Sequence, residues 1–379
     1  MSEFKIFKLG DICDNIAYGY TESASTEVIG PKFLRITDIQ NDFINWDNVP
    51  YCPITEENHK KYKLEIGDII IARTGASTGE TAIFKDERID AVFASYLIRY
   101  KINKRIANPF YVGHILKSYY WKNYVSSIIG GSAQPGANAK QFANFEFSLP
   151  DIQTQNKISE ILTSLEDKIE LNLLMNHTLE AMAQALFKEW FIDFKFSGFD
   201  GVLVDGLPKG WKISKLSSVC EIKYGKDHKQ LEDGDIPVYG SGGIMRYADK
   251  ALFEKESILI PRKGTLSNLF YVSKPFWSVD TMFYTIIKQE SIRKYLFYLL
   301  KSLNLASMNV GSAVPSLTTE VLNKIEIIIP DNKILIEFEM IVSSLYTKMD
   351  VNNNQIQTLT QTRNSLLPRL MSGKIIIEK

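Results

Sequence analysis

The sequence of 379 residues predicts an α+β fold, in which two mixed α/β domains are separated by two long antiparallel coiled-coil helices. Two observations support this fold class: one loop and strand occur twice, and each copy is followed by a long stretch with a coiled-coil period. The stretch GGSAQPGANAKQFANFEFSLPD begins at Gly130, and VGSAVPSLTTEVLNKIEIIIPD begins at Val310, 180 residues later. Because the similarity continues beyond these stretches, duplication of one unit with pseudo-twofold symmetry explains it better than chance.

The internal repeat divides the chain into four predicted segments. We expect a first domain over residues 1–150, a first spacer helix within 151–195, a second domain over 196–330, and a second spacer helix with the C-terminal tail over 331–379. The two domains are expected to contain the same elements in the same order.

Each domain begins with an alternating strand and a short amphipathic turn, FKIFKLGDICD at 4–14 and WKISKLSSVCE at 211–221. Continuous β-branched runs follow, GDIIIARTG at 67–75 and ESILIPRKG at 256–264, and each ends in a basic turn and a glycine. Such runs are typical of buried strands. Another strand, FASYLIRY or TMFYTIIK, and then a helix, PFYVGHILKSYYW or RKYLFYLLKSLN, complete the set.

The two stretches after the Pro-Asp pairs have the period of a coiled coil. Residues spaced alternately four and three apart are apolar at eight of ten positions from Ile158 to Trp190, and at eight of ten from Phe338 to Leu370. Each helix of about 33 residues would be about 50 Å long. The predicted seam residues are Leu162, Leu165, Ile169, Asn172, Leu179 and Leu186 in the first helix, and Val342, Leu345, Met349, Asn352, Leu359 and Leu366 in the second.

The two asparagines of the seam are repeat mates, 180 positions apart. One interpretation is that polar residues are tolerated at a frayed midpoint. The other is that Asn172 and Asn352 fix the register of the helix pair, and we favour it because both helices have one.

No catalytic or metal-binding constellation is predicted. NPFY at 108–111 lacks the second proline of the amino-methyltransferase motif, and Asn108 as an N-cap before Pro109 explains it better. RTGASTGE lacks the Gly-Lys-Ser/Thr ending of a phosphate-binding loop. The three cysteines form no CxxC pair and no metal spacing with the four histidines. The function is therefore expected to be binding.

Charge and hydropathy bear on DNA binding and on the location of the protein. The net charge is zero, but residues 151–195 carry four basic and eight acidic side chains, so neutrality of the whole does not exclude DNA binding elsewhere. It suggests few net phosphate contacts by this chain, with partners supplying the rest. No apolar run is long enough for a membrane span and the first residues contain no signal-peptide core, so a cytoplasmic location and no membrane contact are expected.

The candidate DNA contacts are polar and basic groups at strand ends and in glycine-containing loops. Arginine and lysine there can reach guanine edges or phosphates, and glutamine and asparagine can pair with adenine. The alternative for each turn is simple solvation, and for the amides it is capping of neighbouring elements. The candidates are Arg35, Arg73, Thr74, Gln134, Asn138 and Lys140 in the first domain, and Lys226, Tyr239, Ser241, Arg262, Lys263 and Thr265 in the second.

Taken together, these stretches resemble the specificity subunit of type I restriction-modification systems. The resemblance is carried by GSAQP with SLPDIQTQNKISEIL, by ALFKEWFIDF after the first helix, by IPVYGSGGI with ILIPRKGT, and by SLLPRLMSGKI near the end. It covers nearly the whole length and includes the internal repeat. One departure is NKILIEF after the second Pro-Asp, which lacks the Glu-Gln usual in the family.

The resemblance implies two target-recognition domains, each reading one half of a bipartite site in double-stranded DNA. The helices would set the spacer and dock two DNA adenine methyltransferase subunits, and restriction–translocase subunits would join that core. The chain itself would be non-catalytic and without a cofactor. S-adenosylmethionine would then belong to the methyltransferase partners, and ATP with magnesium to the translocase.

Two other classes of function remain open at this point. A self-contained DNA methyltransferase would bind S-adenosylmethionine as a purified chain. A structural adaptor that links two proteins would not retain a specific DNA duplex in preference to a scrambled one.

Overall fold

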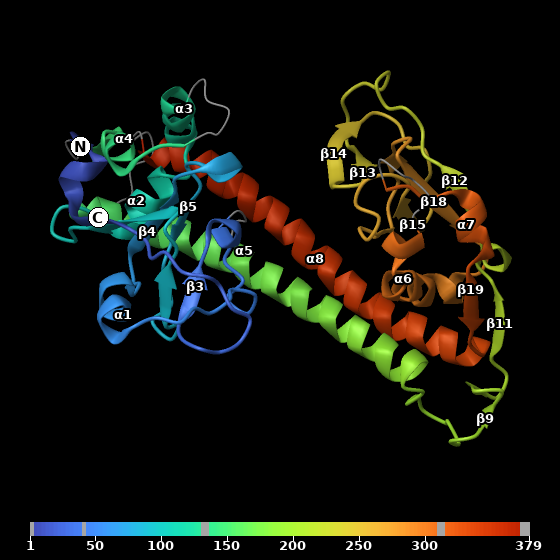
Figure 1. The fold of residues 1–379 in the computed structure, drawn as a ribbon. Helices are drawn as coiled ribbons and strands as arrows, with labels where there is room; N and C mark the ends of the chain where they lie inside the picture. Colours follow the sequence, from blue (N-terminus) through green and yellow to red (C-terminus); the bar gives the residue numbers. More distant parts are fainter. Residues whose placement is uncertain (1–3, 40–42, 130–135, 309–314, 372–379) are drawn as a thin grey trace. The chain divides into compact units, whose positions relative to one another are not determined.

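The structure is a computed structural model that describes residues 4–39, 43–129, 136–308 and 315–371 (Figure 1). The chain divides into two compact units, Met1–Leu174 with Asn352–Lys379, and Met175–Val351. Each unit contains one mixed α/β domain, called here the first or the second head, and parts of both long helices. The division crosses the helices because each head packs on segments of both.

The first head is built on a four-stranded antiparallel sheet in the order β2-β7-β4-β5. A parallel pair, β3-β6, and an antiparallel pair, β1-β8, complete its strands. The strands are β1 (Lys5–Lys8), β2 (Cys13–Tyr18), β3 (Lys32–Leu34), β4 (Asp68–Ala72), β5 (Thr81–Ile83), β6 (Ala91–Phe93), β7 (Leu97–Ile102) and β8 (Glu146–Leu149).

The helices of the first head are short. They are α1 (Glu56–Tyr62), α2 (Pro109–Ile115), α3 (Tyr119–Ile128) and α4 (Ala139–Ala143). The Oδ1 atom of Asn108 accepts from the N–H groups of Phe110 and Tyr111, so the predicted N-cap is confirmed. The expectation of one helix over PFYVGHILKSYYW is wrong, because α2 ends at Ile115 and the hydroxyl of Ser118 caps a new helix, α3.

The second head repeats the strand order of the first. Its four-stranded sheet is β12-β18-β15-β16, β13 pairs in parallel with β17, and β11 pairs antiparallel with β19. These pairings have counterparts in the first head, so the predicted duplication is confirmed, and the antiparallel pairs β13-β14 and β9-β10 are additions of the second unit among the described residues. The strands are β9 (Leu203–Val204), β10 (Leu207–Pro208), β11 (Lys212–Lys215), β12 (Cys220–Tyr224), β13 (Ile236–Gly240), β14 (Gly243–Ala248), β15 (Ser257–Pro261), β16 (Phe270–Val272), β17 (Trp277–Ser278), β18 (Met282–Ile287) and β19 (Glu326–Ile329); the helices are α6 (Arg293–Ser302) and α7 (Thr319–Lys324).

The predicted buried strands form the centre of each head. All five residues of β4 and all five of β15 are buried, as their continuous apolar runs indicate. The matched cysteines lie near the ends of the sheets, where the thiol of Cys13 donates to Leu9 and that of Cys220 donates to Leu216. Burial raises the pKa of each of these two thiols to about 12, so both are inert structural groups.

The long helices are α5 (Ile152–Phe187), followed by a π-helical turn at Lys188–Ile192, and α8 (Asn332–Met371). In the first unit the early residues of α5, Ile158 and Leu162, share a core with the late residues of α8, Leu367 and Leu370. In the second unit Phe187 at the end of α5 contacts Phe338 near the start of α8. Early residues meet late ones in both units, so the helices pair antiparallel in each. All twelve predicted seam side chains are buried or half-buried.

The seam asparagines lie in the first unit and are fully enclosed. Asn172 is 0% exposed, and its Nδ2 donates to the Oε1 atom of Gln355 at 3.2 Å. Its Oδ1 is buried and has no hydrogen-bond partner among the described residues. Asn352 is also buried. Enclosure on this scale excludes the interpretation of a frayed, solvated midpoint for these two residues.

Candidate nucleic-acid interface

The basic turn after β4 is hydrogen-bonded to the loop that the sequence repeats. The N–H of Arg73 donates to the carbonyl of Tyr96 at 3.0 Å, and its carbonyl accepts from the N–H of Ala137 at 2.9 Å. The next residue, Thr74, forms a β-bridge with Gly136. The end of the repeated loop therefore supports the turn that carries the candidate arginine.

The turn after β15 in the second head has the same connections. The N–H of Arg262 donates to the carbonyl of Thr281 at 2.9 Å, and its carbonyl accepts from the N–H of Leu317 at 2.9 Å. Lys263 forms a β-bridge with Ser316. The two loop residues lie 180 positions after those that support Arg73. This shared support gives a physical reason for the duplication of the loop: in each head it holds the end of a buried strand.

Each arginine of these turns lies against a tyrosine that sequence reasoning missed. The guanidinium carbon of Arg73 lies 5.2 Å from the ring centre of Tyr18 and 5.9 Å from that of Tyr96. The guanidinium carbon of Arg262 lies 5.4 Å from the ring centre of Tyr224. A signal was present, because Tyr-Gly follows each of the matched cysteines after a few residues.

Asn138, at the end of the first repeated loop, serves as a helix cap. Asn138 forms a capping box with Gln141, in which each side-chain oxygen accepts from the backbone N–H of the other residue at 2.9 Å. A bidentate contact of Asn138 with adenine would have to break this box. Lys140 is exposed in the first turn of α4, close in sequence to Ala137, whose N–H donates to the carbonyl of Arg73. Gln134 lies outside the described residues.

Arg35 is engaged with a neighbouring carboxylate. Its Nε donates to the Oδ2 atom of Asp38 at 3.1 Å, and its Nη2 donates to Oδ1 at 2.9 Å. This paired geometry satisfies one edge of the guanidinium and neutralises its charge locally. Among the described residues, the side-chain hydrogen bonds and the ion pair of Arg35 are with Asp38 and not with the turn at Arg73.

In the second head, two candidates lie directly beside the basic turn. A Cβ atom at Gly264, where φ is +89°, would lie 3.1 Å from the hydroxyl of Ser241, so these residues are adjacent. Asn268 links them further, since its Nδ2 donates to the carbonyl of Ser241 at 2.8 Å and its N–H donates to that of Thr265 at 3.1 Å. Ser241, Arg262, Lys263 and Thr265 thus form one polar surface.

The remaining candidates of the second head differ in exposure. Lys226 is exposed, and its carbonyl accepts from the indole N–H of Trp277 at 2.9 Å. Tyr239 is half-buried on β13 against Phe270, and burial raises the pKa of its hydroxyl. Tyr239 therefore has a packing role that needs no ligand.

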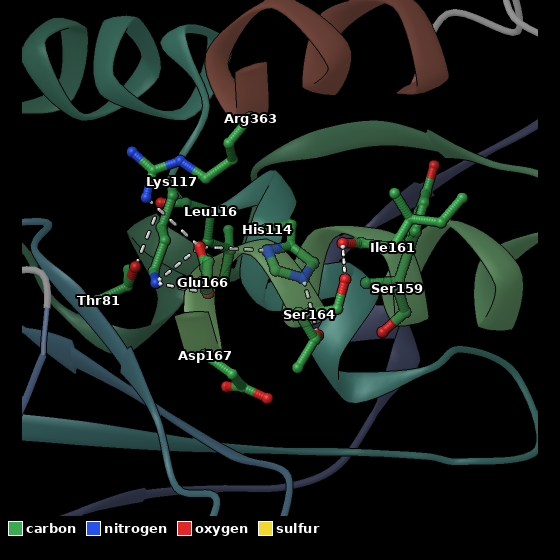
Figure 2. Close-up of polar contacts among 12 residues, drawn as sticks. Thr81, His114, Leu116, Lys117, Ser159, Ile161, Ser164, Glu166, Asp167 and Arg363 are labelled. Carbon is green, nitrogen blue, oxygen red and sulfur yellow. Dashed lines mark hydrogen bonds and ion pairs between the residues drawn. The ribbon is translucent and has the colours of Figure 1, made fainter. Parts of the chain in front are cut away.

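The first head is joined to α5 by a buried polar cluster (Figure 2). His114 on α2 and Lys117 after it converge with Arg363 of α8 on the carboxylate of Glu166. The distances to its Oε1 are 3.4 Å from His114 Nδ1, 3.1 Å from Lys117 Nζ and 3.8 Å from Arg363 Nη1. The other imidazole nitrogen of His114 lies 3.2 Å from the hydroxyl of Thr163.

The electrostatics of this cluster favour an ionised carboxylate. Burial acts to raise the pKa of Glu166, but the hydrogen bond with His114 and the charge of Lys117 outweigh burial. The pKa of Glu166 therefore lies far below its ordinary value. The chemistry is that of an ion-paired joint and not of a proton donor or acceptor at neutral pH.

The second head has a corresponding joint with different chemistry, in which Tyr346 lies 180 positions after Glu166 and the carboxylate comes from another position, Glu180. Glu180 of α5 accepts from the hydroxyl of Tyr298 at 2.9 Å and from Lys301 Nζ at 2.7 Å. The hydroxyls of Tyr298 and Tyr346 lie 3.1 Å apart. The helix that follows the central sheet is thus bonded to the long helices in both units.

The described parts of the chain contain neither a metal-binding cluster nor a membrane-spanning helix. No group of three or more histidine, cysteine, aspartate or glutamate side chains there could hold a metal ion. Nor does any helix of that part have the length and apolar character that crossing a membrane requires.

Comparison with known proteins identifies the family of this arrangement. The family model described as the type I restriction modification DNA specificity domain matches residues 1–181 and again 208–361. The type I restriction enzyme HindI specificity subunit of Haemophilus influenzae is 26% identical, over 99% of this chain and 100% of that protein. The MjaIX specificity subunit of Methanocaldococcus jannaschii is 27% identical, over 71% of this chain and 69% of that protein.

Among solved structures, the fold is similar to that of the S subunit of a type I restriction-modification system from M. genitalium. The TM-score is 0.62, and the match covers 97% of this chain and 96% of that one. At 16% identity this likeness speaks for the fold alone.

Proposed function

The chain belongs to the family of type I restriction-modification specificity subunits, and from this membership we propose that each head reads one half of a bipartite site in double-stranded DNA. A specificity subunit is the recognition component of its system and not the catalytic one. The observation that supports two readers is the matched basic turn, present once in each head on the same structural support.

The chemistry of these turns suits base and phosphate contacts. An arginine fork can donate to O6 and N7 of guanine, and a lysine or threonine beside it can reach phosphates. Thr74 and Lys263 occupy the same place after the two arginines. The two heads thus carry different side chains on the same backbone arrangement, as expected if they recognise different half-sites.

We propose that the long helices set the number of base pairs between the half-sites. Helix α5 has 36 residues without a break, or about 54 Å at 1.5 Å per residue. The clusters at Glu166 and at Glu180 bond each head to the helices of its own unit. Because each head is attached to the helices by several polar contacts and a packed core, a change in helix length should move the whole head. The basic turn at Arg73 or Arg262 would move with it.

The proposed docking surface for methyltransferase subunits is the exposed apolar face of the helices. Ile161 and its repeat mate Ile341 are both exposed, and so are Leu171 and its mate Val351. Their occurrence at matched positions outside the packed seam is the observation that supports a docking role. Because the set occurs twice, we propose that two DNA adenine methyltransferase subunits dock, one on each copy, and that restriction–translocase subunits join them.

Under this proposal the cofactors belong to the partners. S-adenosylmethionine would bind the methyltransferase subunits, and ATP with magnesium the translocase. This chain would contribute only the DNA site, so its effect is measured through the methylation it directs.

The test is genome-wide mapping of methylated adenines in cells with and without this chain. We expect one bipartite motif to be methylated only when the chain is present. Exchange of residues 1–150 for the matching domain of a relative should change one half of the motif and leave the other half intact. Alteration of both halves would contradict independent heads, and an unchanged methylation map without the chain would contradict the recognition function.

A further inference from the structure

Tyr18 and Tyr224 occupy the same place in the two heads. Each is the last residue of the strand that begins at the matched cysteine, β2 or β12, and each residue is about half exposed, 44% and 50%. Each lies against the arginine of the basic turn, Arg73 or Arg262. In each head an exposed tyrosine at a strand end therefore lies beside a candidate arginine.

The backbone after each tyrosine is held in one position. A Cβ atom at Gly19 would lie 2.2 Å from the carbonyl oxygen of Ala94, and one at Gly225 would lie 2.0 Å from that of Val279. The N–H groups of these glycines also donate into the neighbouring strand segment, at 3.1 Å and 2.9 Å. Only glycine permits this approach, so the tyrosine before it has a fixed direction relative to the sheet.

The arginines are restrained on one side and open on the other. Nε of Arg73 donates to the carbonyl of Ser95 at 3.1 Å, and Nη1 of Arg262 donates to the carbonyl of Asp280 at 3.1 Å. Within the described residues, the two Nη atoms of Arg73 and the Nε and Nη2 atoms of Arg262 have no hydrogen-bond partner. Each guanidinium is therefore oriented by one carbonyl and by aromatic rings, those of Tyr18 and Tyr96 for Arg73 and that of Tyr224 for Arg262, while other nitrogens remain for a ligand.

We propose that Tyr18 and Tyr224 are positioning residues, which hold the guanidinium planes of Arg73 and Arg262 in the orientation that reads a base pair. A cation within about 6 Å of an aromatic ring centre is attracted to the ring face. An arginine already held in the plane required for a bidentate contact loses less side-chain freedom on binding. The tyrosine acts on the base only through its arginine.

This inference rests on the proposed function, and it differs from two other roles for the same rings. A tyrosine that stacked directly on DNA would act independently of the arginine. A tyrosine needed only for folding would affect stability and all base pairs equally. Tyr18 also accepts from the N–H of Ala139 through its hydroxyl, at 3.1 Å, so the ring and the hydroxyl must be separated in the test.

The experiment uses the full chain assembled with its methyltransferase subunits, and duplexes that carry the mapped site or single base-pair changes in it. The variants are Tyr18→Leu, Tyr18→Phe, Arg73→Ala and the double variant Tyr18→Leu with Arg73→Ala. Tyr120→Leu is the matched control, because Tyr120 is an exposed tyrosine of the same head on α3. Tyr224→Leu with Arg262→Ala repeats the design in the second head.

We expect Tyr18→Leu to lower discrimination about tenfold at the same one or two base pairs that Arg73→Ala affects. The double variant should lose no more than Arg73→Ala alone, and Tyr18→Phe should stay within about twofold of the wild type. Thermal unfolding midpoints and discrimination in the other half-site should be unchanged.

Four kinds of outcome would overturn the proposal. Additive losses in the double variant, or losses at other base pairs, would show that the ring contacts DNA itself. A Tyr18→Phe variant as weak as Tyr18→Leu would assign the effect to the hydroxyl bond with Ala139. Unchanged discrimination in Tyr18→Leu, with a loss in Arg73→Ala, would contradict the positioning role and leave the arginine as a base reader. Unchanged discrimination in Arg73→Ala would contradict both this inference and the arginine's part in the proposed function.

Discussion

Arg262 and Lys263 are adjacent basic residues at the end of the most buried strand of the second head. The replacement of both by alanine should weaken DNA binding through that head by several kcal/mol at most, since a base or charge contact contributes about 1–3 kcal/mol. The measurement is methylation of the native site at limiting protein. Lys255→Ala is the control, because Lys255 is exposed before the opposite end of the same strand. Unchanged methylation would indicate that Arg262 and Lys263 lie in a solvated turn and do not contact DNA.

Glu166 gives a prediction about acid stability. Its depressed pKa means that it contributes stability at pH values above about 4.5, the unfolded value, and that this contribution is lost as the pH falls through the folded pKa. Glu166→Gln should therefore cost about 1–3 kcal/mol of unfolding free energy at pH 7, because Lys117 and Arg363 lose their charged partner. The difference from the wild type should narrow below pH 4.5.

Denaturant unfolding at pH 7 and at several lower values measures this directly. Glu160→Gln is the control, as Glu160 is exposed on the same helix. A difference between Glu166→Gln and the wild type that widened on acidification would contradict the assignment of a depressed pKa.

Functional residues that belong to a local sequence pattern could be predicted, whereas contacts between residues far apart in the sequence could not. Arg73 and Arg262 were candidates because a basic turn after a buried run is a local pattern. Their support by Ala137 and Leu317 joins residues far apart in sequence, which no local pattern encodes. The tyrosines were missed for the same reason: Tyr18 meets Arg73 only once the sheet has formed.

Among the elements, the long helices and buried strands were predicted well, because helical and strand periods are local and extend over many residues. The helix boundary at Ile115 was missed, although Ser118 is a typical N-cap residue that interrupts the helix there. Apolar residues continue through this break, and their pattern hid it.

The seam of the helix pair offers a prediction at this scale. Asn172 has a buried oxygen without a partner among the described residues, which costs stability, and a polar seam residue specifies register. Asn172→Leu should therefore raise the unfolding free energy by about 1–2 kcal/mol and yield methylated sites with more than one spacing. Lys168→Leu, at an exposed position of the same helix, is the control.

Thermal unfolding and methylation mapping of the same variant provide the two readouts. A less stable variant would show that the asparagine makes a net favourable contribution. A more stable variant with a single, unchanged spacing would show that it does not determine the register.

For the whole molecule, the repeat explains the order of the chain: head, helix, head, helix. Each unit takes one head and parts of both helices, so neither head has a complete set of contacts without segments distant in sequence. The class of fold could be predicted because duplication is visible in the sequence itself. The two half-sites could not, because side-chain identities do not specify bases without the docked geometry.

The central claim is that the helices set the spacing of the two half-sites. Four residues inserted after Asn172 and four after Asn352 lengthen both helices where the chain passes between its compact units. The contact of Asn172 with Gln355 is retained, because both partners stay on the same side of the insertions, whereas the buried Asn352 moves relative to the first unit. The insertion is a stutter that local unwinding of a coiled coil can absorb.

The insertion adds about 6 Å to each helix and a rotation of about 400°, or about 40° beyond a full turn. B-DNA advances about 3.4 Å and turns about 34–36° per base pair, so both changes correspond to one or two base pairs. Methylated adenines mapped in cells that carry the variant should define a motif with both half-sites unchanged and a spacer one or two base pairs longer. A motif with the original spacing, methylated to the original extent, would contradict the claim that the helices set the distance.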